Sequence, residues 1–175
     1  MKNLASIGSD VRTPAPALQN RAYATRRLAE EIDRAKREAP YEFSILLVQF
    51  DGLTEITGRL GHAPTDDIWQ VAVNALAQDL KPQDLCCRLG GDEFLLILPS
   101  ASRAEATALV ERLRLRWQPK SGSREAGIVL NVGIASYPVE GTTVQALFAA
   151  ADESLYTSTL PQNAVRTASG LQQVA

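Results

Sequence analysis

The stretch Arg88-Leu89-Gly90-Gly91-Asp92-Glu93-Phe94 lies between two short apolar runs, Leu85-Cys86-Cys87 and Phe94-Leu95-Leu96-Ile97-Leu98. Such runs, broken by paired glycines, predict a β-hairpin with glycine at both turn positions and two acids beside them. Because glycine has no side chain, a bulky anionic ligand could approach this turn closely. Carboxylates beside such an opening suit divalent metal and nucleotide phosphate chemistry. The alternative is an ordinary turn, with Glu93 solvated at its edge.

The composition indicates one globular domain. The 175 residues are 45% hydrophobic and 22% charged, with a formal net charge of −2. This balance gives no global basic field for nucleic acid or an anionic membrane. No apolar run approaches the ~20 residues of a membrane span, and the first residues lack the apolar core of a signal peptide. We therefore expect a cytoplasmic domain. Cys86 and Cys87 are adjacent in a predicted strand, so their side chains point to opposite faces and a mutual disulfide is not expected.

The remaining chain reads as helices alternating with strands. Residues 44–50 form a nearly continuous apolar run, which predicts a central strand buried on both faces. Ser102 with Glu105 predicts a capping box, and Thr142 with Gln145 predicts the start of the last helix. The predicted order is one helix followed by β-αα-β-β-α-β-α, an α/β (α+β) fold with a mixed, antiparallel-containing sheet flanked by helices. We expect a linker or tail over residues 1–17, the folded domain over 18–165 and a C-terminal tail over 166–175.

The apolar faces of the predicted helices follow from periodicity. The helix after Gly61 has a stripe of apolar residues three and four positions apart. The helix after Ser102 and the last helix have similar stripes. The stripe residues are Ile68, Val71, Ala72, Ala75 and Leu76; Ala106, Leu109, Val110, Leu113 and Trp117; and Val144, Leu147, Phe148, Ala151 and Leu155.

The hairpin and its flanks resemble the GGDEF family, the diguanylate cyclase domains of bacterial signalling. The resemblance covers roughly Leu18 to Asn163, and Leu18-Gln19-Asn20-Arg21 resembles the end of the motif that precedes the family's first helix. It implies a fold similar to the palm of nucleotide polymerases. It also implies condensation of two GTP molecules, one on each of two facing domains, into cyclic di-GMP and pyrophosphate.

The resemblance implies a metal site and a catalytic acid. Asp92 matches one metal ligand, and Glu93 resembles the family's catalytic acid. The first-strand metal position holds Gln49, whose amide supplies an oxygen without a charge, so Mg²⁺ would be held more weakly. Asp51 matches the family's second Asp but lies ~7 Å further along the strand. Gln49 could equally be a hydrogen-bonded buried amide.

Substrate positions also follow from the resemblance. Gly90 and Gly91 would admit the phosphates. Thr57 stands at the position of a base-reading Asn, and Asp66 matches a base-reading Asp. Asp66 also lies in the first turn of a helix, where an acid favours the macrodipole without any ligand.

Cations that the family places against the phosphates are absent at the matching positions. Thr54 and Thr159 stand at two of them, and the third falls near Asn163. A triphosphate carries about four negative charges, so this pocket would neutralise it poorly.

A product-binding site is also implied. Many family members carry Arg-x-x-Asp, ending six residues before the first Gly, which binds cyclic di-GMP. Here the stretch is Lys81-Pro82-Gln83-Asp84, with Lys in place of Arg. Arg112 resembles the secondary Arg of that site, or is a solvated helix residue. Lys offers a point charge where Arg offers a planar fork, so we expect lower affinity with the same sign of charge.

Three functions remain open on the sequence. The first is a degenerate GGDEF domain that binds cyclic di-GMP or a protein partner and makes little or no product. The second is an active diguanylate cyclase, a homodimer using GTP and weakly held Mg²⁺. The third is a structural interaction domain without nucleotide function. In each case a sensory or effector domain of a parent protein is an expected partner, and nucleic acid and membrane insertion are not expected.

Overall fold

The computed structural model describes residues 20–60, 62–117, 127–159, 164–167 and 170–173. The first nine elements follow the predicted order of helices and strands. The elements are α1 (Arg21–Arg37), β1 (Phe43–Asp51), α2 (Leu53–Leu60), α3 (His62–Ala77), β2 (Leu85–Gly90), β3 (Glu93–Leu98), α4 (Arg103–Arg116), β4 (Val129–Tyr137), α5 (Val144–Thr159), β5 (Ala164–Thr167) and β6 (Gly170–Gln173).

Four strands form the central sheet, in the order β2-β3-β1-β4. Each of the three strand pairs is antiparallel. The predicted fold class, a sheet with antiparallel pairs flanked by helices, is confirmed. β1 lies inside the sheet and its residues 43–48 are all buried, as the apolar run predicted.

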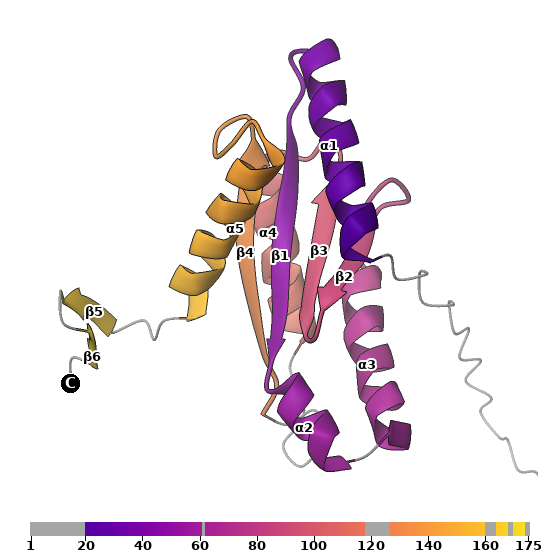
Figure 1. The fold of residues 1–175 in the computed structure, drawn as a ribbon, viewed down its shortest axis with the longest axis vertical. Helices are drawn as coiled ribbons and strands as arrows, with labels where there is room; N and C mark the ends of the chain where they lie inside the picture. The colour runs from indigo at the N-terminus through magenta and orange to yellow at the C-terminus, as the bar shows by residue number, and fades with distance from the viewer. Residues whose placement is uncertain (1–19, 61, 118–126, 160–163, 168–169, 174–175) are drawn as a thin grey trace, which may run out of the picture.

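Helices cover both faces of this sheet because β1 is apolar on both sides. Alternate β1 residues Leu46, Val48 and Phe50 pack with residues of α2, α3 and α4. The intervening residues Phe43, Ile45 and Leu47 pack with α1 and α5. Figure 1 shows α1 and α5 on the near side of the sheet and α4 behind it. Cys86 and Cys87 are both free and belong to opposite faces, and burial raises the pKa of the Cys86 thiol to about 12.

The stripe predicted for α4 is buried as expected. Two details of the other helices, one in an apolar stripe and one at a helix cap, differ from the prediction. Val71 in α3 is 42% exposed, and Val73 is buried in its place. The start of α5 is capped by Thr143, not Thr142, because the Thr143 hydroxyl accepts a hydrogen bond from Ala146 N at 3.1 Å. One position along a helix turns a side chain by about 100°, so such shifts decide which side chain reaches the core.

β5 and β6 form a two-stranded sheet of their own. This hairpin includes part of the stretch predicted to be a C-terminal tail. The domain boundaries given above remain predictions.

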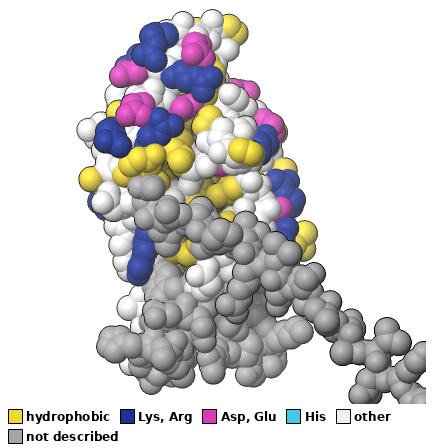
Figure 2. All heavy atoms as spheres, turned by 90° about the vertical axis from the view of Figure 1, so that its right-hand side faces the viewer, with side chains coloured by type: hydrophobic (Ala, Val, Ile, Leu, Met, Phe, Trp, Pro, Cys, Tyr) yellow, Lys and Arg dark blue, Asp and Glu magenta, His cyan; other side chains and the backbone are white. Residues whose placement is uncertain are grey.

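Charged side chains of opposite sign alternate over the upper part of the molecule in Figure 2. On α1 they form ion pairs three and four residues apart, including Arg34 with Glu38 at 2.9 Å and Arg26 with Glu30 at 3.7 Å. Such exposed pairs contribute little to stability.

Candidate functional site

The β2–β3 turn is built to leave open space above its backbone. Gly90 is the last residue of β2 and pairs with Glu93, so the turn itself is Gly91-Asp92 rather than the two glycines predicted. Gly90 and Gly91 have φ of 147° and 51°, in a region that side chains disfavour. A Cβ at either position would meet nothing within 4 Å. The turn can therefore be approached closely by a ligand.

Two arginines hold this turn, and the sequence analysis assigned a role to neither. Arg88 donates from Nε and Nη2 to the Gly91 carbonyl at 3.1 and 2.8 Å. Arg21, at the start of α1, lies with Nη2 3.7 Å from Glu93 Oε2 and donates from Nε to the Leu89 carbonyl at 3.4 Å. Leu89 is the extra residue where the β2–β3 register shifts, so it has no partner residue in that strand pair. Arg21 ends the motif before the first helix, and Arg88 begins the hairpin motif. Their places in these motifs were the signal from which a role at the turn could have been predicted.

The end of β1 lies beside the turn. Phe50 N donates to the Asp92 carbonyl at 3.1 Å. Gln49 faces Glu93 on β3 and Asn131 on β4 in the strand register. Gln49 is half-buried and Asp51 is exposed. The structure thus brings Gln49, Asp92 and Glu93 together at one end of the sheet. Their positions in the family motifs predicted this neighbourhood.

The predicted base and phosphate positions lie on helices. Thr54 is exposed on α2. Thr57 is in α2, Asp66 in α3 and Thr159 in α5, but the side chains of all three lie outside the described residues, as does the whole of Asn163.

A second group of predicted residues meets at a separate hollow of about 260 Å³, which we call the charged pocket. Lys81 and Asp84, between α3 and β2, line it together with Arg112 of α4. Lys81 N donates to Asp84 Oδ2 at 2.7 Å, and Asp84 N donates to the Lys81 carbonyl at 3.0 Å, so the two residues fix each other's place. Burial raises the pKa of Asp84, and the hydrogen bond from Lys81 N opposes that shift.

The charged pocket also contains two acids that the sequence analysis did not place there. Asp79 follows α3, and Glu105 lies in the first turn of α4. Glu105 was recognised only as the partner of Ser102 in the capping box, which the structure confirms. For Asp79 the sequence carried no signal, because its position depends on how the end of α3 approaches α4.

Comparison with known proteins identifies the family of this chain. The family model described as "Diguanylate cyclase, GGDEF domain" matches residues 14–162. The chain belongs to the GGDEF family.

Individual GGDEF proteins agree with this assignment. The response regulator PleD of Caulobacter vibrioides is 31% identical over an alignment of 144 residues, which covers 79% of this chain and 32% of PleD. The bifunctional diguanylate cyclase/cyclic di-GMP phosphodiesterase MucR of Pseudomonas aeruginosa is 34% identical over 141 residues, 79% of this chain and 20% of MucR. This chain therefore spans a third or less of the length of these relatives.

Solved GGDEF domains have the same fold. The crystal structure of the GGDEF domain of TpbB from Pseudomonas aeruginosa superposes with a TM-score of 0.71 at 33% identity, covering 81% of this chain and 89% of that one.

Across the described residues, no helix is both long and apolar enough to cross a bilayer.

The metal that the GGDEF family implies is Mg²⁺. This ion prefers charged oxygen ligands, and the first-strand position offers only the neutral amide oxygen of Gln49. Within the described residues, no three His, Cys, Asp or Glu side chains are grouped closely enough to hold a metal. Glu93 is in addition engaged by Arg21. The donors present here fit a tightly held Mg²⁺ poorly.

Proposed function

We propose that this GGDEF domain is a receptor for cyclic di-GMP that synthesises little or none of it. The observation that carries the proposal is the charged pocket, where Lys81 and Asp84 of one segment line a hollow together with Arg112 of α4. A receptor of this kind would act in the cytoplasm, where its nucleotide ligand is made.

The chemistry of these side chains suits the ligand. Cyclic di-GMP carries two phosphodiester charges and two guanines. The planar fork of Arg112 can donate two parallel hydrogen bonds to a phosphate or to guanine O6 and N7, and Lys81 adds a point charge. The Asp84 carboxylate can accept from a guanine N–H.

Weak synthesis is supported by the other end of the sheet. GTP turnover needs charge against the transferred phosphates. Gln49 supplies none, and Thr54 and Thr159 stand where the family places cations. The loss of transition-state stabilisation from several such positions should reduce the rate steeply.

An active diguanylate cyclase is the second candidate function. The open turn at Gly90 and Gly91, with Asp92 and Glu93 beside it, favours this candidate. Activity would require two copies of the domain to face each other. As relatives such as PleD are much longer than this chain, a sensory or effector domain in the parent protein would control either function.

Calorimetric titration with cyclic di-GMP tests the receptor. We expect the wild type to bind and Lys81→Ala and Arg112→Ala each to weaken binding by about tenfold or more, because each removes a charge-assisted hydrogen bond. Arg114→Ala is the matched control, since Arg114 is on the same helix, pairs with Glu111 at 3.0 Å and does not line the charged pocket. Equal affinity in all four proteins would reject the site.

Incubation with GTP and Mg²⁺ tests the second candidate. We expect cyclic di-GMP to form at least about a hundredfold more slowly than with an active diguanylate cyclase at equal concentration, in line with the loss of one electrostatic catalytic group. A comparable rate would establish the enzyme and leave the charged pocket as its product site.

A further inference from the structure

Each cation at the charged pocket is already held by a carboxylate of this chain. Lys81 Nζ lies 3.7 Å from Glu105 Oε1. Arg112 Nε lies 3.6 Å from Asp79 Oδ1, and Arg116 Nη2 donates to the same oxygen at 3.0 Å. The Asp79 side chain is only 13% exposed, and its Oδ2 also lies 3.0 Å from Arg116 Nη2, so both of its oxygens face that guanidinium.

These pairs determine the charge that a ligand would meet. The lining of the charged pocket contains three carboxylates, Asp79, Asp84 and Glu105, against two cations, Lys81 and Arg112. A dianionic phosphodiester entering the pocket must therefore compete with internal anions for both cations. Exposed pairs are easier to displace than buried ones, and Lys81 and Glu105 are each more than half exposed, whereas Asp79 is mostly buried.

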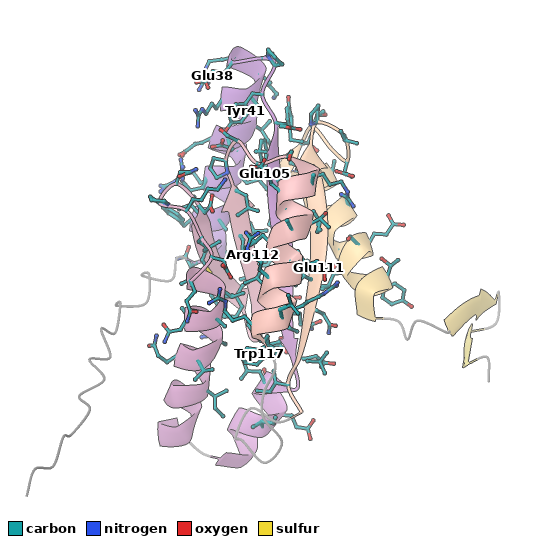
Figure 3. All side chains as sticks on the ribbon, turned by 180° about the vertical axis from the view of Figure 1, so that it is seen from behind. Glu38, Tyr41, Glu105, Glu111, Arg112 and Trp117 are labelled. Atoms are coloured by element: carbon teal, nitrogen blue, oxygen red, sulfur yellow. The ribbon has the colours of Figure 1, made fainter. Side chains whose placement is uncertain are left out.

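Glu105 can compete with a ligand for Lys81 while its side chain stays hydrogen-bonded to Ser102. Its Oε2 accepts from Ser102 N at 2.8 Å and from Ser102 Oγ at 3.0 Å, while Oε1 is the oxygen nearest to Lys81. The capping box thus fixes the side chain at the edge of the pocket. Figure 3 shows Glu105 and Arg112 on one flank of α4 and Glu111 on the other.

We propose that Glu105 limits the affinity of the charged pocket for cyclic di-GMP by occupying, beside Lys81, the place that a phosphate oxygen would take. The proposal rests on the proposed function, because it concerns cyclic di-GMP binding at the same pocket. The Glu105 carboxylate competes with the phosphates of the ligand for Lys81 and thereby lowers the affinity. The hydrogen bonds from Ser102 lower the pKa of the Glu105 carboxyl, so this anion persists at neutral pH.

The test is Glu105→Gln, titrated with cyclic di-GMP by calorimetry. Gln at the third position of a helix also completes a capping box, so the substitution removes the charge and keeps the cap. We expect binding to become about two- to fivefold tighter, the range in which an exposed ion pair acts. Glu111→Gln changes the same charge on the same helix away from the pocket and should leave the affinity unchanged. In a Lys81→Ala background, Glu105→Gln should have a much smaller effect.

The outcomes separate this inference from the proposed function. If the wild type binds and Glu105→Gln binds equally or less tightly, the inference is wrong and the receptor stands. If Glu111→Gln tightens binding as much as Glu105→Gln, only net charge matters and the inference is again wrong. If neither the wild type nor Glu105→Gln binds cyclic di-GMP, both proposals fail.

Discussion

Among the glycines whose surroundings the structure describes, Gly133 is the one where an added methyl group would come closest to other backbone atoms. It lies on β4 under α5, and a Cβ there would lie 2.0 Å from the Ala151 carbonyl oxygen and 2.5 Å from Leu155 N. Both are backbone atoms, so neither can move aside without shifting the helix. We expect Gly133→Ala to lower the free energy of unfolding by about 3 kcal/mol or more, as overpacked cores do. Urea denaturation followed by circular dichroism measures this.

Gly58 provides the control for that experiment. It lies on α2, and an added Cβ would meet nothing within 4 Å. Gly58→Ala should therefore raise the free energy of unfolding by roughly 0.5–1 kcal/mol, the difference between the two residues inside a helix. If Gly133→Ala and the wild type have the same urea midpoint of unfolding, β4 and α5 do not pack as closely as the structure indicates.

Side chains at positions of a family motif could be predicted from the sequence, including Lys81 and Arg112 of the charged pocket, and other side chains that meet across elements could not. Gln49 was assigned to the end of the first strand by its spacing from Asp51, and the register places it there. Asp79 was missed because only the packing of α3 against α4 brings it to Arg112. For α3, the apolar stripe was correct in period, but Val71 is exposed and Val73 is buried.

The start of α4 is an element whose stability depends on one hydroxyl. Ser102 Oγ accepts from Glu105 N at 3.3 Å, and the Glu105 carboxylate accepts from Ser102 N. Ser102→Ala should lower the free energy of unfolding by about 1 kcal/mol, because the Glu105 N–H loses the hydroxyl that accepts its hydrogen bond. Ser102→Thr retains the hydroxyl at the N-cap and should stay within a few tenths of a kcal/mol of the wild type in the same urea titration. Equal losses in both variants would contradict this role of the cap.

Helices and strands were predictable where their signals are local. The capping box of α4 and the apolar run of β1 each lie within a few residues, and both were confirmed. The start of α5 was predicted one residue too early because Thr142 and Thr143 both suit an N-cap, and only the backbone geometry chooses between them. β5 and β6 were missed because two short paired strands carry too little apolar pattern to distinguish them from a tail.

The sheet joins two cores into what should be one cooperative unit. Leu28 of α1 is fully buried on one face, and Trp117 packs on the opposite face with its rings in contact with Phe50 of β1. Because β1 and β3 contribute side chains to both cores, loss of one core should unfold the other.

We expect Leu28→Ala to lower the free energy of unfolding by about 2–5 kcal/mol. Trp69 is first replaced by Phe so that Trp117 is the single fluorescent tryptophan. In that background, Leu28→Ala should move the unfolding transition seen by Trp117 fluorescence to lower urea concentration, together with the transition seen by circular dichroism. Arg26→Ala, an exposed change on the same helix, should shift neither by more than about 0.5 kcal/mol. A Trp117 transition that stays in place while the circular dichroism transition moves would mean that the two faces unfold independently.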